Sequence, residues 1–108
     1  MKVKLQGEAK KRQGSNSGVY TLQPEFVNGY PTWMQLSLRN SIWFDTSNGG
    51  WNIGLTSNLG SNIAGIIGSS LEDDWPQNLS GWKYDDGSPS DYVDAGSDVI
   101  IENYSNCK

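Results

Sequence analysis

Apolar and polar residues alternate along short stretches of the chain, and glycines or Asn-Gly pairs separate these stretches at short intervals. No apolar pattern with the 3.6-residue period of a helix persists for three turns, so the pattern predicts an all-β fold. The expected strands span residues 3–9, 19–22, 32–38, 41–46, 51–57, 82–86 and 98–104, with a further short apolar run at 62–70. We predict a small antiparallel sandwich or partly open barrel of about seven or eight short strands, in which the last strand pairs with the first.

Two short segments between the first strands carry turn signals. Residues 14–18 are rich in glycine and serine, and Asn28-Gly29 is the sequence that favours a two-residue hairpin turn. The basic run Lys10–Arg12 lies beside the first of these segments, and we expect it to form part of a solvated turn.

The middle of the chain predicts a meander of three strands, whose register follows from the lengths of its turns. If residues 39–40 form a two-residue turn, Leu36 lies opposite Trp43, and if the next hairpin pairs Asp45 with Trp51, the faces of all three strands are fixed. Directly opposed residues share a face. The expected core face collects these residues: Met34, Leu36, Leu38, Trp43, Trp51, Ile53 and Leu55. We therefore expect Trp43 and Trp51 to be buried.

The opposite face of this meander is the candidate binding site. It brings the rings of Trp33 and Phe44 within reach of one another, with the side-chain amides of Gln35 and Asn52 beside them. Aromatic rings stack on the faces of sugars, while amides bond to sugar hydroxyls, so this combination predicts a carbohydrate platform. A second packed layer that covers the same face is the competing interpretation.

Composition and charge exclude several classes of function. Histidine is absent and Cys107 is the only cysteine, which removes Ser-His and Cys-His nucleophile pairs and the common zinc sites. No P-loop motif is present. The net charge is −4, with carboxylates dominant after Gln13, so a nucleic-acid partner is not expected for the folded body.

The remaining carboxylates suggest two weaker hypotheses. A glycosidase needs a convergent carboxylate pair, and nothing in the sequence brings any two together. The acidic segment 85–98 offers hard oxygen ligands for calcium, but its spacing does not match an EF-hand, and a solvated acidic loop is the favoured interpretation. We predict no catalytic activity, no cofactor and no metal among the site residues.

Length predicts one domain over residues 1–108, with residues 102–108 as a tail or linker. No apolar stretch has the length of a membrane span, no signal peptide is recognisable, and nothing suggests a dimer seam. We expect a monomer without a membrane partner, which is cytoplasmic if the chain is complete and extracellular if it is a fragment of a secreted protein.

Several motifs occur in an order that resembles a small all-β module found singly or in copies within multidomain proteins of invertebrates and protists. The motifs are GVY (18–20), VNGYPTW (27–33), SIWF (41–44), WNIG (51–54), NLGS (58–61), WP (75–76), WKY (82–84) and DVII (98–101). This resemblance implies an accessory module. With the five tryptophans, it favours a non-catalytic binding module for carbohydrate or a similar polar ligand, and the alternative is a protein-interaction or purely structural module.

Overall fold

A computed structural model describes residues 1–46, 49–69, 75–76, 79, 81–85 and 92–102. Within these residues the chain forms one curled antiparallel sheet of nine strands, in the order β8-β7-β6-β5-β4-β3-β2-β1-β9, so the all-β prediction is confirmed. The strands are β1 (Lys2–Leu5), β2 (Gly18–Val27), β3 (Tyr30–Gln35), β4 (Asn40–Asp45), β5 (Gly50–Leu55), β6 (Ile66–Ser69), β7 (Lys83–Asp85), β8 (Tyr92–Asp94) and β9 (Val99–Glu102). The helices are α1 (Gly7–Gln13) and the 3₁₀ turns η1 (Gly14–Asn16) and η2 (Thr56–Asn58).

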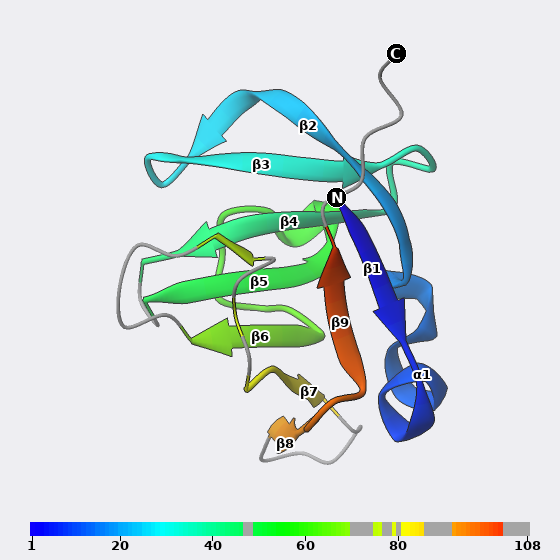
Figure 1. Ribbon diagram of the computed structural model, residues 1–108. Helices are drawn as coiled ribbons and strands as arrows, with labels where there is room; N and C mark the ends of the chain where they lie inside the picture. Colours follow the sequence, from blue (N-terminus) through cyan, green and yellow to red (C-terminus); the bar gives the residue numbers. More distant parts are fainter. Residues whose placement is uncertain (47–48, 70–74, 77–78, 80, 86–91, 103–108) are drawn as a thin grey trace.

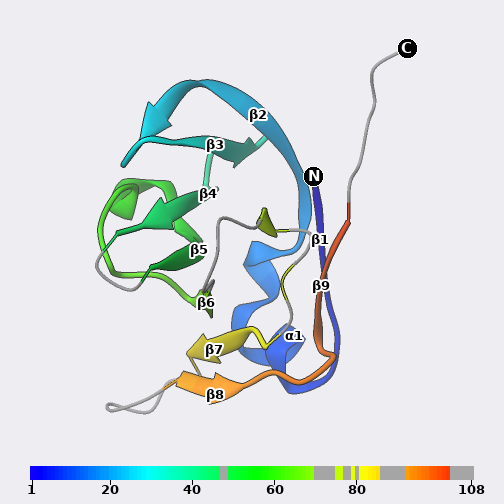
Figure 2. The same cartoon turned by 60° about the vertical axis from the view of Figure 1, so that its left-hand side comes forward.

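The sheet curls into a half-barrel, in which the first and last strands of the chain, β1 and β9, lie side by side. Strand β1 pairs with β9 from Lys2 opposite Glu102 to Leu5 opposite Val99, as the sequence predicts. Figure 1 shows this pair running across the ends of the other strands, and Figure 2 shows the sheet curving from β2 through β6 to β8 around the interior. Alternate residues of β1 and β9 face inward, which closes one side of the core.

The main core lies on the inner face of the half-barrel. Its buried members are Met1, Val3, Leu5, Ala9, Tyr20, Ile42, Trp51, Ile53, Ile66, Trp82, Tyr84, Ala95, Val99 and Ile101. Gly68 of β6 lies opposite Trp51, and a Cβ atom there would come within 2.6 Å of the Trp82 ring. The glycine therefore lets a large indole pack directly on the backbone of β6.

The basic run is helical, so the prediction of a solvated turn at Lys10–Arg12 is wrong. The segment EAKKRQ consists of residues with good or moderate helix propensity, and α1 buries Ala9 completely while its lysines face solvent. Lys11 Nζ lies 3.3 Å from Glu8 Oε2, one turn away. A helix of seven residues is too short to show an apolar pattern over three turns, which explains why the sequence did not indicate it.

The hairpin between β2 and β3 confirms the Asn-Gly turn. Val27 pairs with Tyr30, and the two residues between them, Asn28 and Gly29, have φ angles of 56° and 85°. Two consecutive positive φ angles define a type I′ turn, which asparagine and glycine accept more readily than other residues. The turn places Tyr30 at the start of β3, on the inner side of the sheet.

The turn between β3 and β4 differs from the expected one. Trp33 pairs with Ile42 and Met34 with Ser41, so the turn spans residues 36–39. Relative to the predicted register, β3 is displaced along β4 by an even number of residues. An even displacement leaves the same residues of the two strands on a common face. The cause lies at the two ends of the turn, where Gln35 and Asn40 both donate side-chain hydrogen bonds to the carbonyl of Ser15, at 3.0 and 2.6 Å.

Two expected core leucines lie in this turn, and a third lies at the end of β5. Leu36 is 81% exposed, and Leu38 and Leu55 are also exposed, so their assignment to the core is wrong. The leucines of the turn project into solvent because the strand ends before them. Met34, the remaining member of that expected face from β3, is only partly buried.

The register between β4 and β5 differs by one residue from the prediction. Phe44, and not Asp45, pairs with Trp51. A slip of one residue moves every side chain of β5 to the other face, so Trp43 and Trp51 lie on opposite sides of the sheet. Both are buried as predicted: Trp51 faces the main core, while Trp43 donates its indole N–H to the carbonyl of Ser61 at 2.9 Å, on the outer side.

Because both indoles are fully buried, we expect Trp43→Ala and Trp51→Ala each to lower the free energy of unfolding by roughly 3–5 kcal/mol. Chemical denaturation followed by circular dichroism measures the loss. Trp75→Ala is the control, since that indole is 43% exposed and its removal should cost much less. Equal losses for Trp43→Ala and Trp75→Ala would contradict the burial of Trp43.

Stability should also fall at high pH because of Tyr20. Burial raises the pKa of this phenol, whose hydroxyl donates to the carbonyl of Asn16 at 2.7 Å. In the unfolded chain the tyrosine has a pKa of about 10, so the stabilisation that comes from the raised pKa is complete below this pH. Above it the unfolded chain loses the proton while the folded protein keeps it, and the free energy of unfolding should fall by about 1.4 kcal/mol per pH unit. Urea titrations at pH 8 and 11 measure this decline, which should be shallower in Tyr20→Phe.

Candidate functional site

Five aromatic rings gather on the inner side of the half-barrel, at the end of β4 and β5 nearest the β2–β3 turn. We call them the aromatic cluster: Tyr30, Trp33, Phe44, Trp51 and Trp75. The β2–β3 turn positions Tyr30, and the observed pairing of β4 with β5 places Phe44 directly opposite Trp51. The cluster therefore depends on strand register, except for Trp75, which lies outside the strands.

Trp51 is the hub of the aromatic cluster. Its ring centroid lies 5.4 Å from Phe44, 5.7 Å from Trp33 and 5.8 Å from Tyr30, in edge-to-face arrangements. It lies 6.1 Å from Trp75 in a tilted arrangement. These separations and orientations are the ones that aromatic pairs prefer, so the buried ring fixes the positions of the four around it.

Exposure differs strongly within the aromatic cluster. Trp51 is 1% exposed, Tyr30, Trp33 and Phe44 are half-buried, and Trp75 is 43% exposed. The Trp75 ring lies 6.3 Å from Trp33 at an interplanar angle of 84°, and the following residue, Pro76, is buried. An exposed indole thus rests against two others and is held by a buried neighbour in the chain.

Two of the four predicted site residues belong to the aromatic cluster. Trp33 and Phe44 share a face, as expected, but it is the inner face that carries the main core and not the face opposite the core, so that part of the prediction is wrong. Both side chains remain partly accessible. Trp33 is less buried than Trp43. Phe44 stacks on Tyr30, with ring centroids 4.1 Å apart.

The two predicted amides are both engaged in hydrogen bonds within the protein. Asn52 lies on the outer face because of the one-residue slip, where its Nδ2 atom donates to Asp45 Oδ2 at 3.2 Å and to the Ser61 carbonyl at 3.3 Å. Gln35 is on the inner face but is buried, with its amide donating to the carbonyls of Ser15 and Ser17 at 3.0 Å. Placing Asn52 beside Phe44 was therefore wrong, and both amides serve internal hydrogen bonds.

Asn28, which the sequence indicated only as a turn residue, lies beside the cluster. Its Nδ2 atom donates to the carbonyl of Phe44 at 2.8 Å, and the residue is exposed. Tyr30 was also missed, although its position next to the Asn-Gly turn gave a signal. Trp75 lies in a segment without strand periodicity, so no pattern in the sequence could place it.

The structure bears on the metal-site and membrane hypotheses only where its residues are described. Among the described residues there is no group of three or more His, Cys, Asp or Glu side chains that could hold a metal. Residues 86–91 of the acidic segment, and residues 103–108 with Cys107, lie outside the described part of the chain. No helix in that part has the length and apolar character needed to span a membrane.

The chain was compared with models of protein families, with curated proteins and with solved structures, and none of them matches it. A function for this chain can therefore be argued only from its own side chains.

Proposed function

We propose that this protein is a non-catalytic carbohydrate-binding module and that the aromatic cluster is its binding surface. The observation that supports this proposal is the indole of Trp75, which is 43% exposed although buried and half-buried rings lie beside it. A ring that already packs against two others loses little conformational freedom when it binds a ligand.

The chemistry of the cluster suits the less polar face of a sugar ring. Trp75 offers exposed ring surface for C–H contacts, and Trp33 packs against it in an edge-to-face arrangement. The amides that we expected to bond sugar hydroxyls are engaged elsewhere, so hydrogen bonds would come from Asn28, beside Phe44, and from backbone groups. With few fixed polar groups, the site should bind weakly and tolerate more than one sugar.

The alternative is a protein-interaction module, and β2 supplies the observation that favours it. Leu22 and Phe26 are 60% and 67% exposed, and within the described residues the recorded pairs of β1 with β2 involve only Gly18 and Val19. Exposed apolar residues on a strand with one open edge favour pairing with another chain. Pro24 and Glu25, at the irregularity between Leu22 and Phe26, oppose such pairing.

A glycan array followed by calorimetry with any sugar that binds tests the proposal. Trp75→Ala should weaken sugar binding by at least roughly tenfold, as expected when one stacked aromatic anchor is removed. Phe26→Ala is the matched control, because it removes another exposed aromatic ring that makes no recorded contact with the aromatic cluster.

Two outcomes would contradict the carbohydrate proposal. One is an array on which no glycan binds, and the other is equal loss of sugar binding in Trp75→Ala and Phe26→Ala. Capture of a protein partner that Phe26→Ala abolishes and Trp75→Ala preserves would instead support the alternative.

A further inference from the structure

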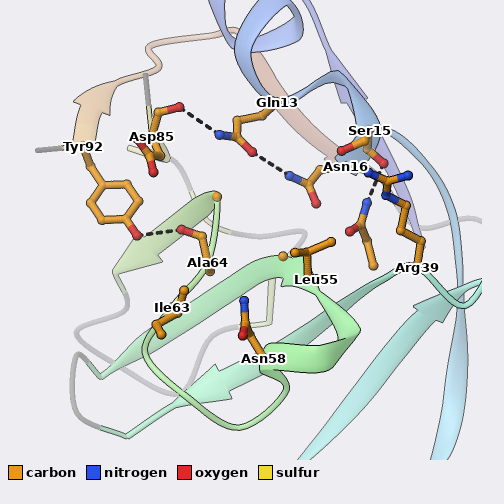
Figure 3. Close-up of a pocket in the computed structure, with 13 residues that line it drawn as sticks. Gln13, Ser15, Asn16, Arg39, Leu55, Asn58, Ile63, Ala64, Asp85 and Tyr92 are labelled. Atoms are coloured by element: carbon orange, nitrogen blue, oxygen red, sulfur yellow. Dashed lines mark hydrogen bonds between the residues drawn. The ribbon is translucent and has the colours of Figure 1, made fainter. Parts of the chain in front are cut away.

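A polar pocket lies at the opposite end of β4 and β5 from the aromatic cluster. Its volume is about 340 Å³, and its walls come from α1 and η1, the β3–β4 turn, the end of β5, residues 63–65, and strands β7 and β8 (Figure 3). Asn40 pairs with Leu55 at this end, whereas Phe44 pairs with Trp51 at the other, about 13 Å away by the rise of a strand. The pocket and the cluster are therefore separate sites.

A short chain of side-chain amides forms one wall of the pocket and fixes its own orientation. Gln13 Nε2 donates to the backbone carbonyl of Asp85 at 2.8 Å, so Gln13 Oε1 must be the atom that faces Asn16. Asn16 Nδ2 donates to that oxygen at 3.0 Å. Turning either amide over would bring two oxygens together, so the remaining atom, Asn16 Oδ1, is an acceptor.

Asn16 Oδ1 has no hydrogen-bond partner, although Asn16 is only 3% exposed. In Figure 3 this oxygen points away from Gln13, toward the side of the pocket where Leu55 and Ala64 lie. Buried polar atoms nearly always have a partner, which makes an unpaired acceptor beside a cavity a specific feature. A donor such as a water molecule or a ligand hydroxyl would satisfy this oxygen.

The other side chains that line the pocket indicate which chemical groups a ligand should carry. Leu55, Ile63 and Ala64 supply an aliphatic side, and the Tyr92 hydroxyl donates to the Ala64 carbonyl at 2.6 Å, which leaves its oxygen able to accept. Arg39 supplies a guanidinium, and its turn is held against β5 because the Thr56 N–H donates to the Arg39 carbonyl at 2.8 Å. Guanidinium groups favour carboxylates as partners.

We propose that this pocket binds a small hydroxylated carboxylic acid of the size of one sugar unit. A ligand hydroxyl donates to Asn16 Oδ1, the carboxylate pairs with Arg39, and the carbon skeleton packs on Leu55 and Ala64. The volume is near the lower limit for small-molecule pockets, which run from roughly 300 to 1,000 Å³, so it suits a single unit and not a chain.

Titration of the ¹⁵N-labelled protein with D-glucuronate tests this proposal, with D-glucose and glutarate as probes that lack the carboxylate and the hydroxyls respectively. We expect saturable shifts at the amides of Asn16, Arg39 and Ala64 with glucuronate. Glucose should bind roughly tenfold more weakly, because it lacks the charge-assisted bond to Arg39. Glutarate should also bind more weakly than glucuronate.

Four variants locate the binding. Leu55→Trp fills the pocket from an exposed position and should abolish the shifts, whereas Leu22→Trp, at another exposed leucine, should not. Arg39→Gln should make glucuronate and glucose equivalent. Asn16→Ala should weaken both sugars, and if it does not fold, Leu55→Trp and Arg39→Gln still decide the outcome.

Three results would overturn the proposal: no saturable shift with glucuronate, shifts that persist in Leu55→Trp, or glutarate binding as tightly as glucuronate. The last would indicate a simple anion contact at Arg39. Binding in this pocket is followed by the amide shifts of Asn16, Arg39 and Ala64, and sugar binding at the aromatic cluster by its loss in Trp75→Ala. Failure of this proposal and failure of carbohydrate binding at the aromatic cluster are therefore distinguishable.

Discussion

The pairing of Phe44 with Trp51 is the constraint on which the interior of this protein depends. It sends Trp51 and Ile53 into the half-barrel and turns Asn52 outward, where Asp45 and the Ser61 carbonyl satisfy the amide. Shifted by one residue, Asn52 would enter an apolar core without these partners, and a buried amide without hydrogen bonds is costly. The polar side chain therefore selects the register as firmly as the indole does.

A second constraint joins the N-terminal segment to the sheet. The carbonyl of Ser15 accepts hydrogen bonds from the amides of both Gln35 and Asn40, which lie at the two ends of the β3–β4 turn. Asn16, the next residue, uses its carbonyl for the Tyr20 hydroxyl and its side chain for Gln13. Hydrogen bonds from the 3₁₀ turn η1 thus join α1, β2, β3 and β4. The polar pocket lies beside these hydrogen bonds.

Local signals in the sequence were sufficient for part of this fold. The Asn28-Gly29 turn has a steric cause within two residues, and the apolar ends of the chain predicted the pairing of β1 with β9. The register of β4 and β5 was not predictable in the same way, because both faces of these strands are covered and nearly every residue is buried. The alternation of apolar and polar residues does not indicate which face is buried when neither face of a strand is exposed to water.

The unpredictable register of β4 and β5 also limited the prediction of the site. Trp33 and Phe44 were assigned to one face correctly because an even displacement of β3 preserves faces, while Asn52 was misplaced by an odd one. Trp75 and Asn16 lie outside the strands, so their positions depend on tertiary packing alone.

The pairing of β1 with β9 also has a kinetic consequence. Residues 2 and 102 meet in the finished sheet, so this contact closes a loop that contains almost the whole chain. The entropy lost in closing so long a loop is regained only when the apolar residues of both strands reach the core. During synthesis β1 is made first and must wait for its partner, with Val3 and Leu5 unable to complete their packing. Folding should therefore be slow for a chain of this length, with the joining of its ends as a late event.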